Sequence, residues 1–181
     1  SVYYSRGYDF QYFVATGDTV ETGGADLKPV LQRQNVSEIE ILGAEASVKW
    51  EIINNVVINA NYAVNHSAIL SFDDPMGLDK DLKGKALIEV PLSQAYASLS
   101  WRNKIVNLHF DWRHTGKEWY DDENTQYIPP YSVFGMKVSK TLFQIFDCSI
   151  SVQDIFDNVT IDRKGMLSPG RFIMAEIIYN I

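Results

Sequence analysis

The 181-residue chain has a single cysteine, Cys148, and the scarcity of this residue excludes several kinds of protein. One cysteine closes no disulfide within the chain and makes no cysteine-based metal motif. Long apolar runs are also lacking, and without about 18 consecutive apolar residues the chain has no transmembrane helix. Basic residues are outnumbered, because 16 lysines and arginines stand against 23 aspartates and glutamates and leave a formal net charge of −7. We therefore expect no nucleic-acid partner.

The sequence is instead rich in alternation between apolar and polar residues. Residues 106–113 read VNLHFDWR, in which every even position is apolar and every odd position is polar. Successive side chains of a β-strand point to opposite faces, so this stretch makes one apolar and one polar face. A strand that crosses an outer membrane needs only ~9–11 residues and shows little more than this alternation. The lack of an apolar helix therefore does not exclude a membrane protein.

Alternating segments recur along the whole chain, and none shows a sustained helical period. We predict an all-β fold in which about eight strands form an antiparallel, up-and-down sheet. The predicted strands cover residues 2–14, 36–52, 56–71, 91–102, 105–120, 131–142, 147–157 and 170–181.

The predicted connections are of two kinds. Tight turns are expected around residues 53–55, 103–104 and 144–146, whereas long polar loops are expected over 15–36, 72–90, 121–130 and 158–169. Because strands of a meander alternate in direction, all the tight turns fall at one end of the sheet and all the long loops at the other. Outer-membrane barrels have this asymmetry, with short periplasmic turns and longer extracellular loops.

Two hairpins allow the strand register to be predicted. A two-residue turn at Asn103-Lys104 keeps apolar residues opposite apolar ones, and so does a three-residue turn over 53–55. The asparagines of the second turn tolerate a left-handed backbone. The expected pairs are Leu99–Leu108, Ala97–Phe110 and Ser98–His109 in the first hairpin, and Lys49–Asn59, Ser47–Asn61 and Trp50–Ile58 in the second.

Alternation alone does not decide which face is the inside. A soluble, lipocalin-like ligand-binding barrel turns its apolar face inward, and a membrane barrel turns it outward to lipid. The predicted strands are longer than the ~5–6 residues of typical globular sheets. Aromatic residues also gather near strand ends, as in the interfacial girdles of membrane barrels: Trp50, Trp101, Trp112, Trp119, Tyr120, Tyr127, Tyr131 and Tyr179. Both observations favour a membrane barrel.

Several short motifs, in order, resemble the C-terminal barrel region of TonB-dependent outer-membrane receptors. Gly43-Ala44-Glu45 resembles a strand motif in which glycine precedes a lumen-facing glutamate. Residues 127–133 (YIPPYSV) resemble the family's YIPAYTV, residues 154–158 (DIFDN) resemble NLFDK, and residues 169–171 (PGR) resemble the start of the last strand. Asp154 stands in place of the family's asparagine. The end of the chain, residues 179–181 (YNI), takes the place of a terminal Tyr-X-Phe, with Ile181 instead of an aromatic residue.

The resemblance implies a fold and a function. Such receptors form a barrel of about 22 strands with a plugged lumen. Residues 1–181 would then be the C-terminal part of the barrel, with the plug domain and earlier strands absent. The function implied is TonB-dependent uptake of a siderophore, cobalamin, haem or sugar, with no enzyme activity and no cofactor. The chain would lie in the outer membrane of a Gram-negative bacterium with its C-terminus periplasmic.

The resemblance also implies partners. These are outer-membrane lipid, a small-molecule ligand, TonB through the absent plug, and the barrel-assembly machinery, which would read Tyr179 and Ile181. The rival interpretations are a complete eight-stranded outer-membrane barrel, structural or enzymatic, and the soluble lipocalin-like barrel. In a larger barrel, strands 2–14 and 170–181 each keep one unpaired edge here, whereas in a closed eight-stranded barrel they pair with each other.

A few residues are candidates for ligand binding at the lumen or the rim: His66, His109, Trp119, Tyr120 and Tyr127. The aromatic members are suited to stacking on a siderophore or sugar, and they fit an aromatic girdle equally well. Ser98, His109 and Asp111 share one polar face and invite a catalytic interpretation, but a water-bathed lumen wall explains them better. The acidic stretches 73–81 and 121–124 offer oxygen ligands for calcium but lack the twelve-residue loop pattern. We expect no metal site.

Overall fold

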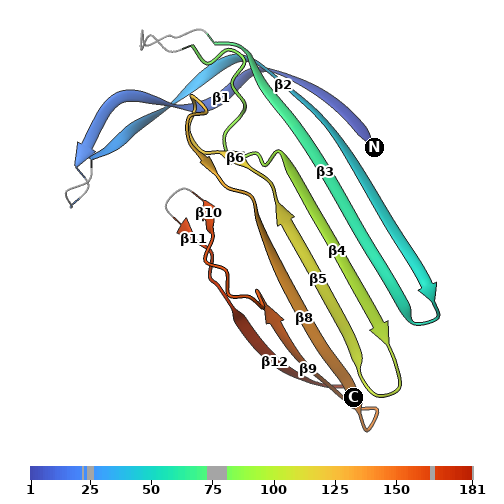
Figure 1. The fold of residues 1–181 in the computed structure, drawn as a ribbon. Coiled ribbons are helices and arrows are strands. Elements are labelled where there is room, and N and C mark those ends of the chain that lie inside the picture. Colours follow the sequence, from blue (N-terminus) through green and yellow to red (C-terminus); the bar gives the residue numbers. More distant parts are fainter. Residues whose placement is uncertain (22, 24–26, 73–80, 164–165, 181) are drawn as a thin grey trace.

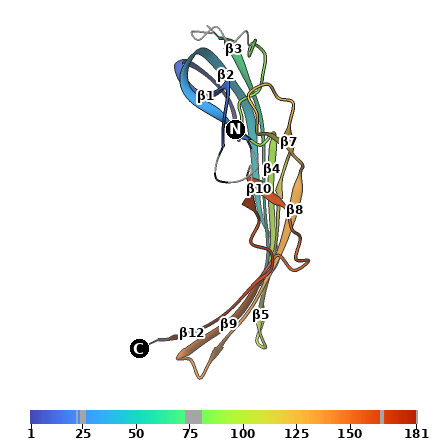
Figure 2. The same ribbon diagram turned by 90° about the vertical axis from the view of Figure 1, so that its left-hand side faces the viewer.

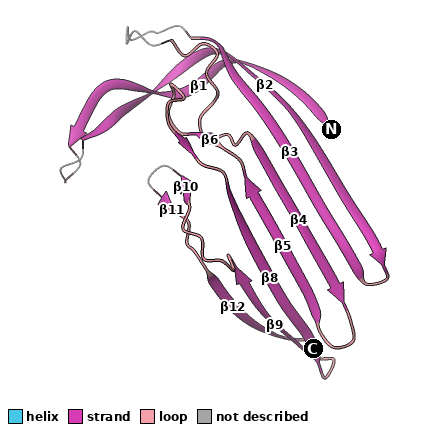
Figure 3. Ribbon diagram, in the orientation of Figure 1, coloured by secondary structure: helices cyan, strands magenta, loops and turns pink. Residues whose placement is uncertain are grey.

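The structure is a computed structural model that describes residues 1–21, 23, 27–72, 81–163 and 166–180. Strands, turns and irregular segments make up all of these residues, and none of them is helical (Figure 3). The described part of the chain accordingly contains no helix that is long and apolar enough to span a bilayer. The prediction of an all-β fold is confirmed.

The main element is an eight-stranded antiparallel sheet with the order β1-β2-β3-β4-β5-β8-β9-β12 (Figure 1). Two small hairpins, β6–β7 and β10–β11, interrupt this meander at the long-loop end. The bounds are β1 Val2–Glu21, β2 Leu27–Ile53, β3 Val56–Ser71, β4 Ser93–Arg102, β5 Asn107–Thr115, β6 Glu118–Trp119, β7 Tyr127–Ile128, β8 Tyr131–Leu142, β9 Phe146–Gln153, β10 Ile161–Arg163, β11 Met166–Leu167 and β12 Phe172–Tyr179.

The sheet is open in the described chain. Strands β1 and β12 stand at opposite ends of the strand order and do not pair with each other. The sheet is strongly curved, and the β1–β2 end and the β12 end both bend to the same side (Figure 2). Each terminal strand therefore keeps one unpaired edge, as predicted for part of a larger barrel, and the arrangement differs from that of a closed eight-stranded barrel.

The tight turns all lie at one end of the sheet (Figure 1). The β2–β3 hairpin has the predicted register, with Lys49 opposite Asn59 and Trp50 opposite Ile58. Asn55 has a positive φ of 74°, as expected of an asparagine in a tight turn. The predicted register is therefore confirmed along the hairpin, and a slip of one residue would have mixed the polar and apolar faces. The predicted three-residue turn is wrong, because Ile53 pairs with Val56 after an irregularity in the ladder and the turn spans only residues 54–55.

The predicted register of the β4–β5 hairpin is wrong by two residues. Leu99 pairs with Phe110 and Ser98 with Asp111, so the connection spans four residues, 103–106, instead of two. The Asn103 side chain accepts hydrogen bonds from the amides of Ile105 (2.8 Å) and Val106 (3.1 Å), which stabilises the wider turn. A register shift of two residues keeps every side chain on its predicted face. The pattern of polar and apolar faces therefore cannot distinguish the two registers.

The predicted loop over residues 15–36 is largely strand. The β1–β2 ladder continues from Val2–Ala44 through Ala15–Leu31 to Glu21–Leu27, with one irregularity between Ala15 and Thr19. Gly17, with a φ of 86°, lies at that irregularity. Glycine tolerates this backbone conformation, so the residues that suggested a loop distort the ladder without ending it.

Three smaller differences also concern strand ends. The predicted strand 105–120 is divided at Gly116, where β5 gives way to β6. The predicted strand 147–157 stops at Gln153 because Asp154 has a positive φ of 51°. The predicted loop 158–169 contains the short hairpin β10–β11.

The cluster of buried apolar side chains in the described structure lies at the long-loop end. Val14, Ile39 and Ile69 form a buried cluster there with Leu82 and Leu87 of the β3–β4 connection. Along the sheet itself the apolar face is open, with many large side chains exposed: Val48 57%, Leu99 39%, Phe110 41%, Ile150 58% and Ile177 73%. A soluble barrel buries this face, so the lipocalin-like interpretation is not supported.

Candidate functional site

The polar face of the sheet forms a continuous wall of hydrogen-bonding groups. Asn59 of β3 donates to Ser98 of β4 (3.4 Å), and Ser100 of β4 lies 2.8 Å from Nδ1 of His109 on β5. At the other edge the Tyr3 hydroxyl donates to the side-chain oxygen of Asn65. Many of these groups form hydrogen bonds with one another across strands. Their remaining donors and acceptors can bind water or a polar ligand.

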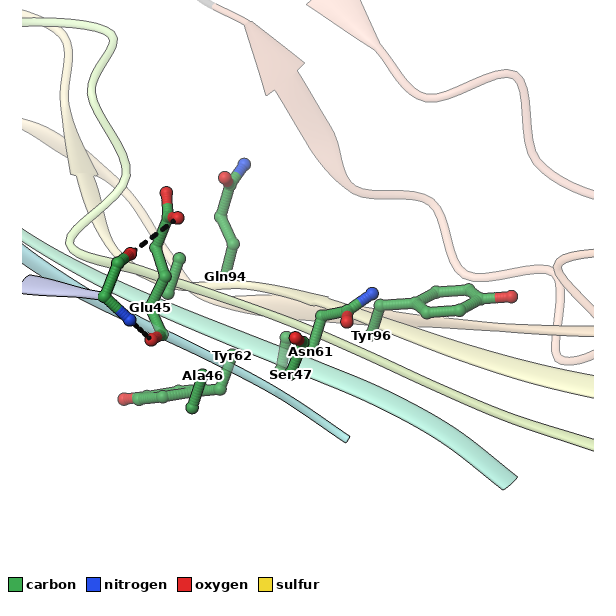
Figure 4. Close-up of a pocket in the computed structure, with 10 residues that line it drawn as sticks. Glu45, Ala46, Ser47, Asn61, Tyr62, Gln94 and Tyr96 are labelled. Carbon is green, nitrogen blue, oxygen red and sulfur yellow. Dashed lines mark hydrogen bonds between the residues drawn. The ribbon is translucent and has the colours of Figure 1, made fainter. Parts of the chain in front are cut away.

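A hollow of about 840 Å³ lies along β2, β3 and β4, and its lining includes Glu45, Asn61 and Gln94 of the polar face as well as side chains of the apolar face. Glu45 and Gln94 rise from one side of the sheet, and Tyr62 and Ala46 extend from the opposite side (Figure 4). The C-terminal strands, tinted red, lie on the side toward which Glu45 and Gln94 project (Figure 4). The polar face is therefore the one around which the sheet curves.

Ser98, His109 and Asp111 do not form a catalytic arrangement. Ser98 is buried, with 6% of its surface exposed, and it bonds to Asn59. His109 bonds to Ser100 instead of Ser98. Asp111 pairs with Arg113, 3.4 Å away. The histidine is thus neither placed against the serine nor oriented by the aspartate, as a nucleophile–base–acid set requires.

His66 lies on the apolar face. It pairs with Leu42 of β2 and follows Val64 by two residues on the same side of β3. Its side chain is exposed. His66 and His109 consequently point to opposite sides of the sheet and cannot contact one ligand.

Trp119 and Tyr127 are brought together at the rim by the β6–β7 hairpin, in which they are paired residues. Their rings meet edge to face with 5.8 Å between centroids. The ammonium of Lys117 lies 3.5 Å from the Trp119 centroid and 4.2 Å from the Tyr127 centroid. We call Lys117, Trp119 and Tyr127 the rim cluster. It presents a positive charge held on two aromatic faces, an arrangement that cation–π attraction stabilises.

Tyr120, the fifth candidate, bonds elsewhere. Its hydroxyl donates to the side chain of Gln126, so it braces the hairpin loop. Sequence reasoning missed Lys117, although its place two residues before Trp119 puts both side chains on one side of an extended segment.

The rim cluster rests on a fixed connection between β3 and β4. Asn124 accepts a hydrogen bond from the amide of Ala86 (2.6 Å) and donates one to its carbonyl (3.1 Å). Ser67 accepts from the amide of Leu87 (3.0 Å), and the amide of Glu89 donates to the carbonyl of Trp119 (2.8 Å). The connection is thereby attached to β3 on one side and to the β6–β7 hairpin on the other.

The Asp121 side chain in the acidic tip stabilises the turn in which it lies. Both carboxylate oxygens accept hydrogen bonds, from Thr125 and from the amide of Gln126 (2.7 Å). Burial raises the pKa of the Asp121 carboxyl, but these hydrogen bonds outweigh burial and hold the pKa below its ordinary value. Residues 73–80 of the other acidic loop lie outside the described residues. The described part of the chain holds no group of three or more histidine, cysteine, aspartate or glutamate side chains suited to a metal ion.

The end of the chain is bound to the β8–β9 turn. The Tyr179 ring lies against Phe146, with 5.4 Å between centroids. The Asn180 amide donates to the carbonyl of Ile145 (2.8 Å), and its side chain donates to Asp147 (2.8 Å). Ile181 lies outside the described residues.

Comparison with known proteins gives a consistent family. The family model described as "TonB dependent receptor-like, beta-barrel" matches residues 1–153. The iron-regulated outer membrane virulence protein of Vibrio cholerae serotype O1 is 27% identical over 149 residues, which cover 77% of this chain and 21% of that protein. The chain thus spans about a fifth of the length of the curated relatives it matches.

Solved structures of the same kind superpose on the sheet. The siderophore receptor PiuA from Acinetobacter baumannii gives a TM-score of 0.68 at 14% identity, covering 96% of this chain and 23% of that one. The copper transporter OprC gives a TM-score of 0.72 at 17% identity, covering 98% and 27%. At these identities the likeness establishes the fold.

Proposed function

Since the chain belongs to the TonB-dependent receptor-like β-barrel family, we propose that it forms the C-terminal part of the wall of an outer-membrane receptor that imports a ferric siderophore. Members of this family are receptors and transporters, not enzymes. In this proposal residues 1–181 close into a larger barrel with strands and a plug domain that lie outside this chain. The unpaired edges of β1 and β12 are where those strands would attach.

The difference between the two faces of the sheet is the observation that carries the proposal. The apolar face exposes large side chains that water does not favour, which suits contact with outer-membrane lipid. The polar face lies on the inner side of the curve and suits a hydrated lumen. The tight turns would then be periplasmic, together with the C-terminus, and the long loops extracellular.

The siderophore class is proposed from the relatives and from the rim cluster. The curated relative is named for its iron regulation, and PiuA is a siderophore receptor. Lys117 brings a positive charge, and Trp119 and Tyr127 bring aromatic surface, to the extracellular end in the proposed orientation. An anionic chelate with planar groups would be attracted by the charge and would stack on the rings.

The remaining partners follow from the same proposal. Energy would reach the receptor from TonB through the plug domain, and no cofactor would take part. Tyr179 and Ile181 would be read by the barrel-assembly machinery while the chain is still unfolded. In the folded chain the Tyr179 ring already lies against Phe146, so the signal would be available only before β12 pairs with β9.

Binding by the complete encoded receptor tests the proposal. The unaltered receptor is first screened against a panel of ferric siderophores, haem and cobalamin, and we expect it to bind a ferric siderophore. We expect Lys117→Met and Trp119→Ala each to weaken binding of that siderophore by about tenfold. Tyr62→Ala is the control, because Tyr62 is an exposed aromatic residue on the apolar face, away from the rim cluster. Unchanged siderophore binding in both rim variants, or binding of haem or cobalamin alone, would refute the proposed ligand class.

A further inference from the structure

The apolar face carries a groove near its tight-turn end. The groove has a volume of about 330 Å³ and crosses β8, β9 and β12. Its lining includes Val138, Lys140, Cys148, Ile150, Ala175 and Ile177. Two cross-strand rows supply these residues, Val138–Ile150–Ala175 and Lys140–Cys148–Ile177. Small side chains, Cys148 and Ala175, alternate diagonally with larger ones, so the rows leave a depression instead of a flat surface.

Lys140 is the only charged side chain that these three strands place on the apolar face. It is exposed, and no ion pair of Lys140 is found among the described residues. The two carboxylates of the same strands, Asp147 and Glu176, lie on the polar face. Asp147 accepts hydrogen bonds from Thr141 and Asn180, and Glu176 accepts one from Ser149. An unpaired ammonium is therefore left beside an apolar groove.

The next cross-strand row toward the tight turns indicates where the groove lies relative to the lipid headgroups. Leu142, Phe146 and Tyr179 form this row, and the rings of Phe146 and Tyr179 lie tilted against each other. Tyrosine at the end of a membrane strand lies at the level of the lipid headgroups. The ammonium of Lys140, one row away, can reach the same level because a long lysine side chain extends toward the interface.

We propose that this groove binds one anionic phospholipid of the leaflet around the tight turns. An acyl chain lies along Cys148 and Ala175, and the headgroup phosphate pairs with Lys140. The proposal rests on the proposed function, since it requires the apolar face to lie in the membrane. A single lysine near a membrane surface increases the affinity for anionic lipid about fivefold. Filling the groove would instead remove dispersion contacts with the chain, whatever the headgroup.

Lipid binding by the complete receptor tests the groove. The delipidated receptor is titrated in detergent with dioleoyl phosphatidylglycerol or neutral dioleoyl phosphatidylcholine, and bound lipid is counted by native mass spectrometry. Lys140→Ala is expected to lower phosphatidylglycerol binding about fivefold without changing phosphatidylcholine binding. Ala175→Leu is expected to weaken both. Lys104→Ala, an exposed lysine at another tight turn, should leave both unchanged.

Equal losses in Lys140→Ala and Lys104→Ala would overturn the proposal, because they would indicate general attraction to the headgroup region. Normal binding of both lipids by Ala175→Leu would overturn it as well. Each variant is also inserted into vesicles and its folded fraction measured by heat-modifiable migration. If the Lys140 and Ala175 variants insert normally and bind both lipids as the unaltered receptor does, the lipid groove is rejected and the proposed function stands. If the unaltered receptor itself fails to insert, the proposed function is rejected.

Discussion

Val48 and Ser47 are neighbours in β2 that face opposite sides of the sheet, and a charge placed on each would meet different surroundings. Val48 is 57% exposed on the apolar face, and Ser47 is exposed on the polar face. A lipid-facing arginine costs up to about 2–4 kcal/mol near the middle of the bilayer, and a lumen-facing one stays hydrated. We predict that Val48→Arg lowers the folded fraction in bilayers far more than Ser47→Arg. Equal losses would contradict the assignment of faces.

Gly43 is the residue over which Tyr3 reaches Asn65. A Cβ at this position would overlap the Tyr3 ring, so Gly43→Ala should displace the ring and break its hydrogen bond. Overpacking of this kind costs about 1–3 kcal/mol. In the Tyr3→Ala background the ring is absent, and we expect the alanine at 43 to cost almost nothing further. A double-mutant cycle on unfolding free energies measures this coupling, and simple additivity would refute the contact.

Asn124 acts on an element that is distant in sequence, the β3–β4 connection. Asn124→Ala removes both hydrogen bonds to Ala86, each worth about 0.5–1.5 kcal/mol. We predict faster amide hydrogen exchange over residues 82–92 and unchanged exchange in the paired strands β4 and β5. Asn54→Ala, in the β2–β3 turn, is the matched control. Protection of 82–92 that survives the substitution would show that the connection is held by its apolar residues alone.

The β6–β7 loop should respond to acid through Asp121. Hydrogen bonds hold the pKa of its carboxyl below the ordinary value of an aspartate, about 3.9. The charged form therefore stabilises the loop above that value, and the contribution is lost as the pH falls through the lowered folded-state pKa. The protection of the Thr125 and Gln126 amides from hydrogen exchange, taken relative to an unstructured peptide at the same pH, should fall only below about pH 4. Asp121→Asn should weaken the protection at neutral pH, and a flat profile in the unaltered protein would contradict the account.

The strands of the sheet were largely predictable, because period-two alternation is a local signal. Predicted strands 56–71 and 131–142 coincide with β3 and β8. The register of β4–β5 was not predictable from faces, since a shift of two residues leaves every face unchanged. The Asn103 side chain stabilises the wider turn by accepting hydrogen bonds from two amides within it, and the alternation of faces does not indicate these bonds.

The candidate site was less predictable than the sheet. Trp119 and Tyr127 were predicted as separate ligand-binding candidates, and their contact with each other and with Lys117 depends on the β6–β7 hairpin, which is only two residues long on each side. His66 was predicted as a candidate because it lies near the long-loop end of its strand. Its even position in β3 places its side chain on the apolar face. The attachment of Ala86 to Asn124 joins residues 38 positions apart, and no periodic signal in the sequence indicates such a contact.

The whole molecule is a curved open sheet with one polar and one apolar face. An open eight-stranded sheet leaves unpaired backbone groups at β1 and β12, and a bilayer does not tolerate such edges because it offers no hydrogen-bond partners. Further strands on both edges would satisfy them. This remains our proposal, and it is supported by the share of the solved structures that the chain covers, 23% of PiuA and 27% of OprC.

The orientation of the two faces in the membrane is the central claim, and spin-label accessibility along β5 tests it most directly. Nitroxides are attached to single cysteines at 107, 108, 109, 110, 111 and 112 of the complete receptor with Cys148→Ser, reconstituted in vesicles. We predict that the labels at Leu108, Phe110 and Trp112 collide mainly with oxygen, which dissolves in lipid, and that those at Asn107, His109 and Asp111 collide mainly with a water-soluble nickel chelate. The opposite phase, or no alternation, would contradict the account.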